Sequence, residues 1–383
     1  MTTDGSKIVL VGGYGHVGSL LASRLLTRYP GRVVLAGRNR QAAERASGRL
    51  GRGTEPATVD ATDRGSVMAV LEDATALVNV GVDQTEPVLL RAAISRGCGY
   101  LDIGADARAI ANMLDLSPSA RDNDVCALVG AGLDPGATNV LARFAADEAG
   151  GADRIDISLL LSVGDHFGPA AVDWTLSGLA GPVVVHRGGV RKVLSAYRGR
   201  RRIDFPPPVG RKLAYRFPFP EQAFFAETLG ADAADNWYAM DINLASRLLA
   251  GGVRLGIGRA MRSPGARRAA ARLLDWTARI PGGRDDVCAL AEVSGPRGLH
   301  RAALLSRKES ETTARCAVPM VVSLVEGKIP AGVWLPEQVL DARKYLDSLA
   351  ADGMRVLTAP PNPLAEQPSW SRVGGGGSGW TTA

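Results

Sequence analysis

Residues 7–18 read Lys-Ile-Val-Leu-Val-Gly-Gly-Tyr-Gly-His-Val-Gly, and this stretch decides the fold. The apolar run at 8–11 predicts a buried strand, and residues 19–26 repeat apolar side chains with helical spacing. Gly13, Gly15 and Gly18 lie between them in the pattern Gly-x-Gly-x-x-Gly. In a strand–turn–helix unit these glycines permit the tight turn, the approach of a pyrophosphate and close helix packing. The stretch therefore predicts a dinucleotide site with the phosphates at the helix N-terminus.

The same alternation of apolar strands and helices continues to about residue 130. The expected strands are residues 8–11, 33–36, 57–59, 76–80, 100–103 and 126–129, and the expected helices lie near 19–28, 40–50, 65–72, 86–96 and 105–114. Strands that alternate with helices form right-handed βαβ units around a parallel sheet. The predicted fold class is therefore α/β, with a doubly wound parallel sheet of the Rossmann type.

The pattern changes after about residue 136. Further strands are expected at residues 154–163, 183–186, 191–194, 287–294, 302–306 and 355–358, and further helices at 243–280, 311–324 and 336–351. Pro-rich and then Gly-rich sequence makes the tail, residues 359–383, an expected disordered segment. A chain of 383 residues is long enough for two domains.

The formal net charge is +6, and the excess is concentrated in residues 187–216 and 254–284. Nucleic-acid motifs and aromatic platforms are missing, so we expect no nucleic-acid partner. An anionic substrate, an acidic carrier, a membrane surface or simply a solvated arginine-rich face would each account for the charge. Peripheral membrane contact is a minor alternative among these.

The chain has no apolar run long enough to span a membrane and no secretory signal pattern at its start. Its four cysteines are widely spaced, without a metal-binding pattern. These observations predict a cytoplasmic protein with free thiols and no metal site.

The choice of cofactor depends on the end of the second strand, where the adenosine ribose is bound in this fold. An acidic residue there would bind the ribose hydroxyls of NAD. This chain has Arg38, Asn39 and Arg40 instead, and a guanidinium pairs well with a 2′-phosphate. We therefore predict NADP(H), with Arg38 as the principal contact and the other two nearby.

Other cofactor contacts are expected at the carboxyl ends of the strands and in the glycine turn. Asp60 would meet the adenine, and Asn79, Val80 and Gly81 would lie beside the ribose and pyrophosphate. The remaining turn residues complete this part of the site: Tyr14, His16 and Val17.

Several segments together resemble the saccharopine dehydrogenase (saccharopine reductase-like) family of NADP-linked oxidoreductases. They are Val34-Leu-Ala-Gly-Arg-Asn39, Ala76-Leu-Val-Asn-Val80, Arg96-Gly-Cys-Gly-Tyr-Leu-Asp-Ile-Gly104, Ala131-Gly-Leu-Asp-Pro-Gly-Ala137 and Gly332-Val-Trp-Leu-Pro-Glu337. The resemblance is specific over the first 140 residues and loose over 180–300. That middle region shows no clear counterpart of the arginines that bind a substrate carboxylate in amino-acid-binding members.

The resemblance implies a Rossmann domain over residues 1–135, completed by 330–358. It also implies a second α/β domain over 136–329, with an open mixed sheet that binds substrate and forms the contact of a homodimer. We place a helical insertion near 240–282 in that domain. By the same resemblance Ile103 and Gly104 border the cofactor, and Leu133 and Asp134 lie by the nicotinamide.

Three residues are candidates for catalysis. Asp134 ends the sixth strand, where it could hold a substrate amine or orient the nicotinamide, although Asp-Pro-Gly also forms a turn by itself. Tyr100 lies on the fifth strand, and His166 follows the long strand of the second domain. Structural roles are alternatives for both.

We therefore predict an NADP(H)-dependent oxidoreductase that transfers a hydride to or from a C=N bond of a small molecule. A lipid or carrier-bound enoyl or keto reductase is one alternative, and a catalytically inactive NADP-binding scaffold or sensor is another. The basic segment 267–280 is either a helical cap on the substrate cleft or a lid that admits an anionic, lipophilic or carrier-bound substrate. A short-chain dehydrogenase is disfavoured because no tyrosine has a lysine four residues later.

Overall fold

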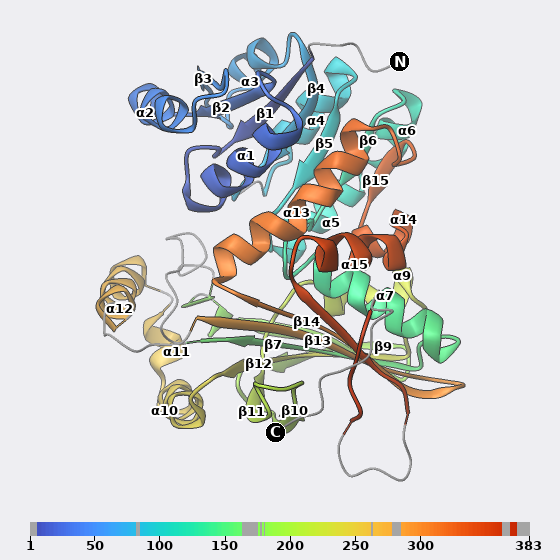
Figure 1. Ribbon diagram of the computed structural model, residues 1–383. Helices are drawn as coiled ribbons and strands as arrows, with labels where there is room; N and C mark the ends of the chain where they lie inside the picture. Colours follow the sequence, from blue (N-terminus) through green and yellow to red (C-terminus); the bar gives the residue numbers. More distant parts are fainter. Residues whose placement is uncertain are drawn as a thin grey trace.

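The computed structural model describes residues 6–81, 85–162, 175–176, 178–179, 181–261, 263–277, 285–361 and 368–373. Two sheets lie one above the other with a layer of helices between them (Figure 1). The predicted α/β class, with a doubly wound parallel sheet and a second mixed sheet, is confirmed.

The first sheet has seven parallel strands in the order β15-β6-β5-β4-β1-β2-β3. They are β1 (Lys7–Val11), β2 (Val33–Gly37), β3 (Glu55–Thr58), β4 (Ala74–Asn79), β5 (Gly99–Asp102), β6 (Cys126–Leu128) and β15 (Gly332–Trp334). Side chains alternate across β1: Ile8 and Leu10 enter one core, and Val9 and Val11 enter another. Both faces of the sheet are covered, which explains the unbroken apolar run.

Helices cover the two faces of this sheet in separate groups. The helices that follow its strands are α1 (His16–Arg28), α2 (Arg40–Leu50), α3 (Arg64–Val70), α4 (Val88–Arg96), α5 (Ala107–Leu114) and α6 (Ser117–Asp122). Apolar residues of α1 and α2 join the core that contains Ile8, and those of α3, α4 and α5 join the core that contains Val9. A helix α6 was not expected.

Helix α1 lies very close to the turn that precedes it. A Cβ atom added to Gly18 would lie 2.3 Å from the carbonyl oxygen of Gly12 and 2.7 Å from the Cα of Gly13. Only a glycine at position 18 permits this approach. The third glycine of the sequence pattern therefore fixes the helix on its strand.

The second sheet is mixed and has ten strands. Its main path runs β10-β11-β12-β7-β13-β14-β16-β17, and β8 pairs with β12 and β9. The strands are β7 (Arg154–Leu161), β8 (Pro182–Arg187), β9 (Val190–Ser195), β10 (Arg200–Asp204), β11 (Arg211–Arg216), β12 (Ala233–Met240), β13 (Asp286–Gly295), β14 (Gly298–Arg307), β16 (Arg355–Ala359) and β17 (Ser371–Arg372). Strands β12 and β7 run parallel, and the other pairs are antiparallel.

Three helices form the layer between the sheets: α7 (Ala137–Ala149), α13 (Glu309–Val325) and α15 (Ala342–Ala351). Helix α13 contacts α1, β4, β5 and β6 on one side and β13 and β14 on the other. Helix α7 packs on β13 and β14. One apolar core therefore runs from the first sheet to the second without interruption.

Residues 330–358 were expected to complete the first domain, and only part of this segment does so. Strand β15 does pair with β6 in the first sheet, but β16 pairs with β14 in the second. Helix α13, expected in the second domain, also packs on the first sheet. The C-terminal segment joins both sheets because its helices occupy the layer that separates them.

The tail is more ordered than expected where the structure describes it. Ala359 ends β16, and Ser371 and Arg372 pair with Thr358 and Leu357. Backbone hydrogen bonds to the edge of β16 give this polar stretch a strand conformation that its composition does not indicate.

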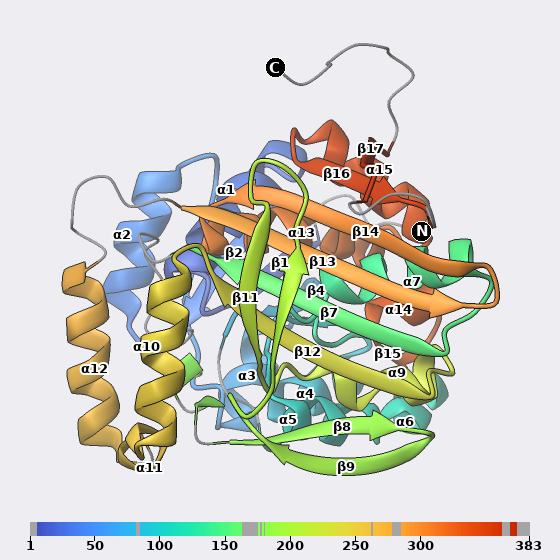
Figure 2. The same ribbon diagram turned by 90° about the horizontal axis from the view of Figure 1, so that it is seen from below.

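The helical insertion consists of α10 (Asn243–Arg254), α11 (Ile257–Ala260) and α12 (Pro264–Thr277), which project beside the second sheet (Figure 2). Apolar side chains of this insertion are exposed: Leu244 by 62%, Leu248 by 68% and Leu255 by 91%. Among the helices of the described part of the chain, none combines the length and the apolar character needed to cross a membrane.

We predict that Gly18→Ala lowers the free energy of unfolding by about 1–3 kcal/mol, because the new methyl group overlaps the backbone of the turn. The control is Gly48→Ala on α2, where an added Cβ meets no atom within 4 Å. That change should be neutral or stabilise by up to about 1 kcal/mol. Urea denaturation of both variants measures the difference, and equal stabilities would contradict the close packing described above.

Candidate cofactor and active site

The glycine turn presents backbone N–H groups at the start of α1. Gly12 has φ +83°, and a Cβ there would lie 2.5 Å from the carbonyl oxygen of Val80. Gly15 caps α1 without a side-chain hydrogen bond, and the first turn of the helix holds no acidic residue. The N–H groups and the positive end of the helix dipole are therefore open to an anion. His16 is exposed at the first position of α1, and Val17 is half-buried beside it.

Tyr14 has a structural role in the turn. Its hydroxyl accepts a hydrogen bond from the Asn39 N–H at 3.0 Å, and its ring lies against Gly37. A Cβ on Gly37 would lie 2.5 Å from the hydroxyl oxygen of Tyr14. Tyr14 thus fixes the end of β2 relative to the glycine turn.

The three polar residues after β2 have different roles. The Asn39 side chain caps α2 by accepting from the Ala42 N–H at 3.0 Å, and Arg40 pairs with Glu44 at 2.8 Å. Arg38 is exposed at the end of the strand and close to Asp60. Of the three, Arg38 is the one that remains suited to bind the cofactor directly.

The side chain of Asp60 is fixed by hydrogen bonds from Thr62, two residues later in the chain. Its carboxylate accepts from the N–H and the hydroxyl of Thr62 at 3.0 and 2.7 Å. These hydrogen bonds, together with the charge of Arg38, hold the pKa of Asp60 below its usual value. An ionised carboxylate therefore lies next to Arg38 at this edge of the sheet.

The other expected cofactor segments lie in one row along the carboxyl ends of adjacent strands. Backbone hydrogen bonds continue the sheet past its strands: Val80 N–H donates to Val11, Ile103 N–H to Asn79, and Ala131 N–H to Asp102. The row brings the glycine turn, Gly81, Gly104 and the loop with Leu133 and Asp134 to the same edge. This edge is where ligands bind in doubly wound sheets.

A buried hydrogen-bonded group supports the middle of this row. Asp102 accepts from the Asn79 amide at 2.6 Å, the Tyr100 hydroxyl at 3.0 Å and the Gly104 N–H at 2.6 Å. Tyr100 is fully buried, and burial raises the pKa of its hydroxyl well above the usual range. We therefore assign Tyr100 and the Asn79 side chain to positioning the strand ends, and the catalytic role expected for Tyr100 is not supported by this geometry.

Asp134 lies in the loop between β6 and α7, where the peptide bond to Pro135 is cis. Both oxygens of its carboxyl group are enclosed and make no hydrogen bond with a described residue. The enclosed hydroxyl of Thr138 lies close to this carboxyl group and acts to lower its pKa. Asp134 is therefore buried at the carboxyl edge of the first sheet without a well-aligned hydrogen bond from a described residue.

Glu221 faces Asp134 from the second domain. It begins the short helix η1 (Glu221–Ala223) and is fully buried, with the carboxyl of Asp134 and the side-chain amide of Asn236 beside its own carboxyl group. Burial, and then the neighbouring Glu221 carboxyl, raise the pKa of Asp134 well above its usual range. Burial likewise raises the pKa of Glu221. We call these two residues the acid pair.

Sequence reasoning missed Glu221. It follows Phe217-Pro-Phe-Pro220, a stretch without periodic pattern, and it lies far from Asp134 in sequence. The side-chain amide of Asn236 on β12 lies beside Glu221 and acts to lower its pKa, and the Asn236 backbone N–H donates to Gln222 at 3.0 Å. No local signal in the sequence brings these residues together.

A third buried carboxyl group belongs to Glu337 on α14 (Pro336–Val339), and it makes two well-aligned hydrogen bonds. It accepts from the Asn139 amide and from the Thr228 hydroxyl, each at 2.9 Å. These contacts join α7, α9 (Phe225–Thr228) and α14. Burial raises the pKa of Glu337 to about 7.

His166, the third candidate for catalysis, lies outside the described residues. Within the described ranges, no group of three or more His, Cys, Asp or Glu side chains is arranged to hold a metal ion.

Comparison with known proteins identifies the first domain. Residues 8–128 match the family described as "Saccharopine dehydrogenase NADP binding domain". The N-terminal domain belongs to the saccharopine dehydrogenase NADP-binding family. The chain is thus placed among the NAD(P)-linked oxidoreductases, and the resemblance seen in the sequence is confirmed. No curated protein sequence matches the chain.

Two solved structures share the fold of this saccharopine dehydrogenase-like chain over nearly its whole length. Apo saccharopine dehydrogenase (L-Glu forming) from Saccharomyces cerevisiae has a TM-score of 0.67 at 14% identity, covering 94% of this chain and 100% of that one. Homospermidine synthase from Legionella pneumophila, in complex with NAD, has a TM-score of 0.65 at 13% identity, covering 94% and 93%. At these identities the likeness establishes the two-domain fold.

We predict that Glu337→Gln raises stability at pH 8 and raises it much less, by about 1 kcal/mol or below, at pH 5. The raised pKa means that native Glu337 keeps its proton where the unfolded residue, with a pKa near 4.5, has lost it. The free energy of unfolding of the wild type therefore falls as pH rises from about 4.5 to 7. A shift of this size corresponds to roughly 3 kcal/mol, and a neutral glutamine can keep both hydrogen bonds.

Thermal and urea denaturation at both pH values measure this effect. Glu227→Gln, on the exposed side of α9, is the control and should change neither value. A loss of stability in Glu337→Gln that is equal at pH 5 and pH 8 would contradict a protonated Glu337.

Proposed function

We propose that this protein is an NADP(H)-dependent oxidoreductase that transfers a hydride to or from the carbon of a C=N bond. The observation that carries the proposal is the acid pair, Asp134 and Glu221, enclosed at the carboxyl edge of the dinucleotide-binding sheet. When bound, the nicotinamide would supply or accept the hydride at its C4 atom.

The chemistry of the acid pair favours a cationic centre. Two buried carboxyl groups in contact do not both ionise readily, so the empty pair retains a proton. An iminium or ammonium group between them would supply a positive charge and N–H donors to both carboxyls. A ketone or an alkene offers neither. The pair can also return a proton to the nitrogen when the C=N bond is reduced.

The two structural relatives agree with this choice of bond. One is named for a reaction that forms L-Glu and the other for the synthesis of homospermidine, and both products are amino compounds. The acid pair favours a nitrogen-containing substrate as a class. We expect a small-molecule substrate, and the homodimer expected from the resemblance stays a prediction.

Arg38 supports NADP(H) rather than NAD(H) as the preferred cofactor. Its guanidinium lies at the end of β2, where a 2′-phosphate would be bound, and the match to the NADP-binding family agrees. The carboxylate of Asp60 lies next to Arg38 and would repel the 2′-phosphate of NADP(H). The preference for NADP(H) over NAD(H) therefore depends on the guanidinium of Arg38.

We expect Arg38→Asp to weaken NADPH binding at least about tenfold more than NADH binding, because the charge-assisted hydrogen bonds to the phosphate are lost. Calorimetric titration of both cofactors measures this. Arg45→Asp, an exposed change on the neighbouring helix α2, is the matched control. Equal losses for the two cofactors in Arg38→Asp would refute the assignment.

A substrate panel tests the reaction class. We expect NADPH consumption with cyclic imines or with ketone–amine mixtures, and none with ketones or enoyl thioesters alone. With a C=N substrate found, Asp134→Asn and Glu221→Gln should each lower kcat/KM by about 100-fold or more and remove the fall of activity at high pH. Glu227→Gln on the exposed surface should retain wild-type activity.

Other outcomes assign the protein to the alternatives. Turnover of enoyl or keto substrates alone would favour a lipid or carrier-bound substrate, which the exposed leucines of α10 and α11 could contact. Stoichiometric NADPH binding without turnover of any substrate would favour a scaffold or sensor. Wild-type kinetics in both acid-pair variants would overturn the role of the pair.

A further inference from the structure

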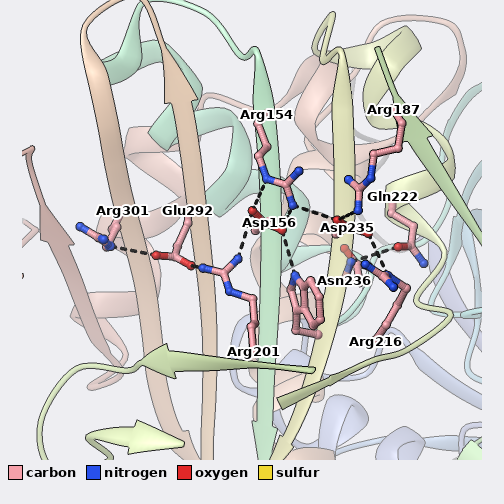
Figure 3. A network of polar contacts seen from close by, with 11 residues as sticks. Arg154, Asp156, Arg187, Arg201, Arg216, Gln222, Asp235, Asn236, Glu292 and Arg301 are labelled. Carbon is pink, nitrogen blue, oxygen red and sulfur yellow. Dashed lines mark hydrogen bonds and ion pairs between the residues drawn. The ribbon is translucent and has the colours of Figure 1, made fainter. Parts of the chain in front are cut away.

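A polar pocket lies on the second sheet, and Figure 3 shows the network of arginines and carboxylates that lines it. Its volume is about 510 Å³, and its charged lining comes from four strands that are distant in sequence and from the hairpin β10–β11. The residues that define it are Arg154, Asp156, Arg187, Arg201, Arg216 and Asp235. We call it the arginine pocket.

The alternation of side chains along the strands separates the arginine pocket from the acid pair. On β12, Asp235 and Trp237 face the pocket, whereas Asn236 faces the acid pair. On β7, Asp156 faces the pocket and Ile155 enters the interdomain core. The two sites therefore lie on opposite faces of one sheet.

The pocket carries an excess of positive charge. Asp235, fully buried, pairs with Arg154, Arg187 and Arg216. Asp156 pairs with Arg154 and Arg201, and Glu292 pairs with Arg201 and Arg301. Arg301 lies outside the pocket lining, so four arginines face three carboxylates in the pocket and leave one uncompensated positive charge.

Donors in the network remain available to a ligand. The Nη1 atom of Arg187 is enclosed and makes no hydrogen bond with a described residue. The side chains of Arg154 and Arg201 are 38% and 32% exposed, at the open side of the pocket. An enclosed guanidinium donor without an acceptor is costly, and an incoming oxyanion would satisfy it.

Trp237 gives the pocket a rigid wall. Its ring lies between Arg201 and Arg216, whose guanidinium carbons are 5.6 and 4.9 Å from the ring centroid. Its indole N–H donates to Asp156 at 2.9 Å. The ring therefore holds two of the arginines in place before any ligand arrives.

We propose that the arginine pocket binds a small molecule through an oxyanion group, either a phosphate or a cluster of carboxylates. Both chemistries fit several guanidinium groups that together carry an excess of positive charge. The site is separate from the cofactor turn and does not depend on the proposed reaction.

The test titrates inorganic phosphate and, separately, citrate into the full chain saturated with NADPH. Binding is followed by calorimetry and by tryptophan fluorescence. We expect saturable binding of at least one anion, lowered tenfold or more in Arg187→Gln and in Arg154→Gln. Arg268→Gln, an exposed change on α12, is the matched control and should bind as the wild type does.

A further variant keeps the proposal falsifiable if the glutamine variants do not fold. Arg201→Lys retains the charge but removes the fork, so binding should weaken while thermal stability is kept. Arg38→Gln tests whether the anion occupies the glycine turn instead. Loss of binding in Arg38→Gln alone, an equal loss in Arg268→Gln, or no saturable binding of either anion to the wild type would each overturn the proposal.

Discussion

Helix α13 lies between the two sheets and packs against both of them, and the candidate active site depends on this shared layer. Ala314, Ala317, Met320 and Val321 of this helix are all buried, and the helix contacts β4, β5 and β6 of the first sheet and β13 and β14 of the second. Its first turn brings Glu309 near Asp134. Because one helix packs on both sheets, the part of the carboxyl edge that holds Asp134 is enclosed by the second domain, whereas Arg38, Asp60 and Gly81 at the same edge are exposed.

That enclosure gives the acid pair its chemistry. In water, Asp134 and Glu221 would both be ionised at neutral pH. In the seam between the domains burial raises the pKa of each. Glu337 is equally buried, but two well-aligned hydrogen bonds at 2.9 Å hold its carboxyl group, and no second described acid faces it as Glu221 faces Asp134. The difference between the two cases lies in the surroundings of the carboxyl group and not in the residue type.

The first domain could be predicted almost entirely from the sequence, because its signals are local. Continuous apolar strands, a glycine turn and amphipathic helices each lie within a few residues, and the structure reproduces their order. Asp134 could be found from its place at a strand end. The second domain carries weaker signals. Strand β12 was missed because its sequence Ala-Ala-Asp-Asn-Trp-Tyr-Ala-Met puts polar side chains on both faces, each buried by a partner from elsewhere.

Strand β12 carries neighbouring residues into two different chemical environments. Asp235 gathers arginines on one face, and Asn236 lies beside the acid pair on the other. The backbone between them is shared, so a change in the twist or position of this strand moves both sites together. Free energies of substitutions made on its two faces are therefore not expected to add, although the side chains never meet.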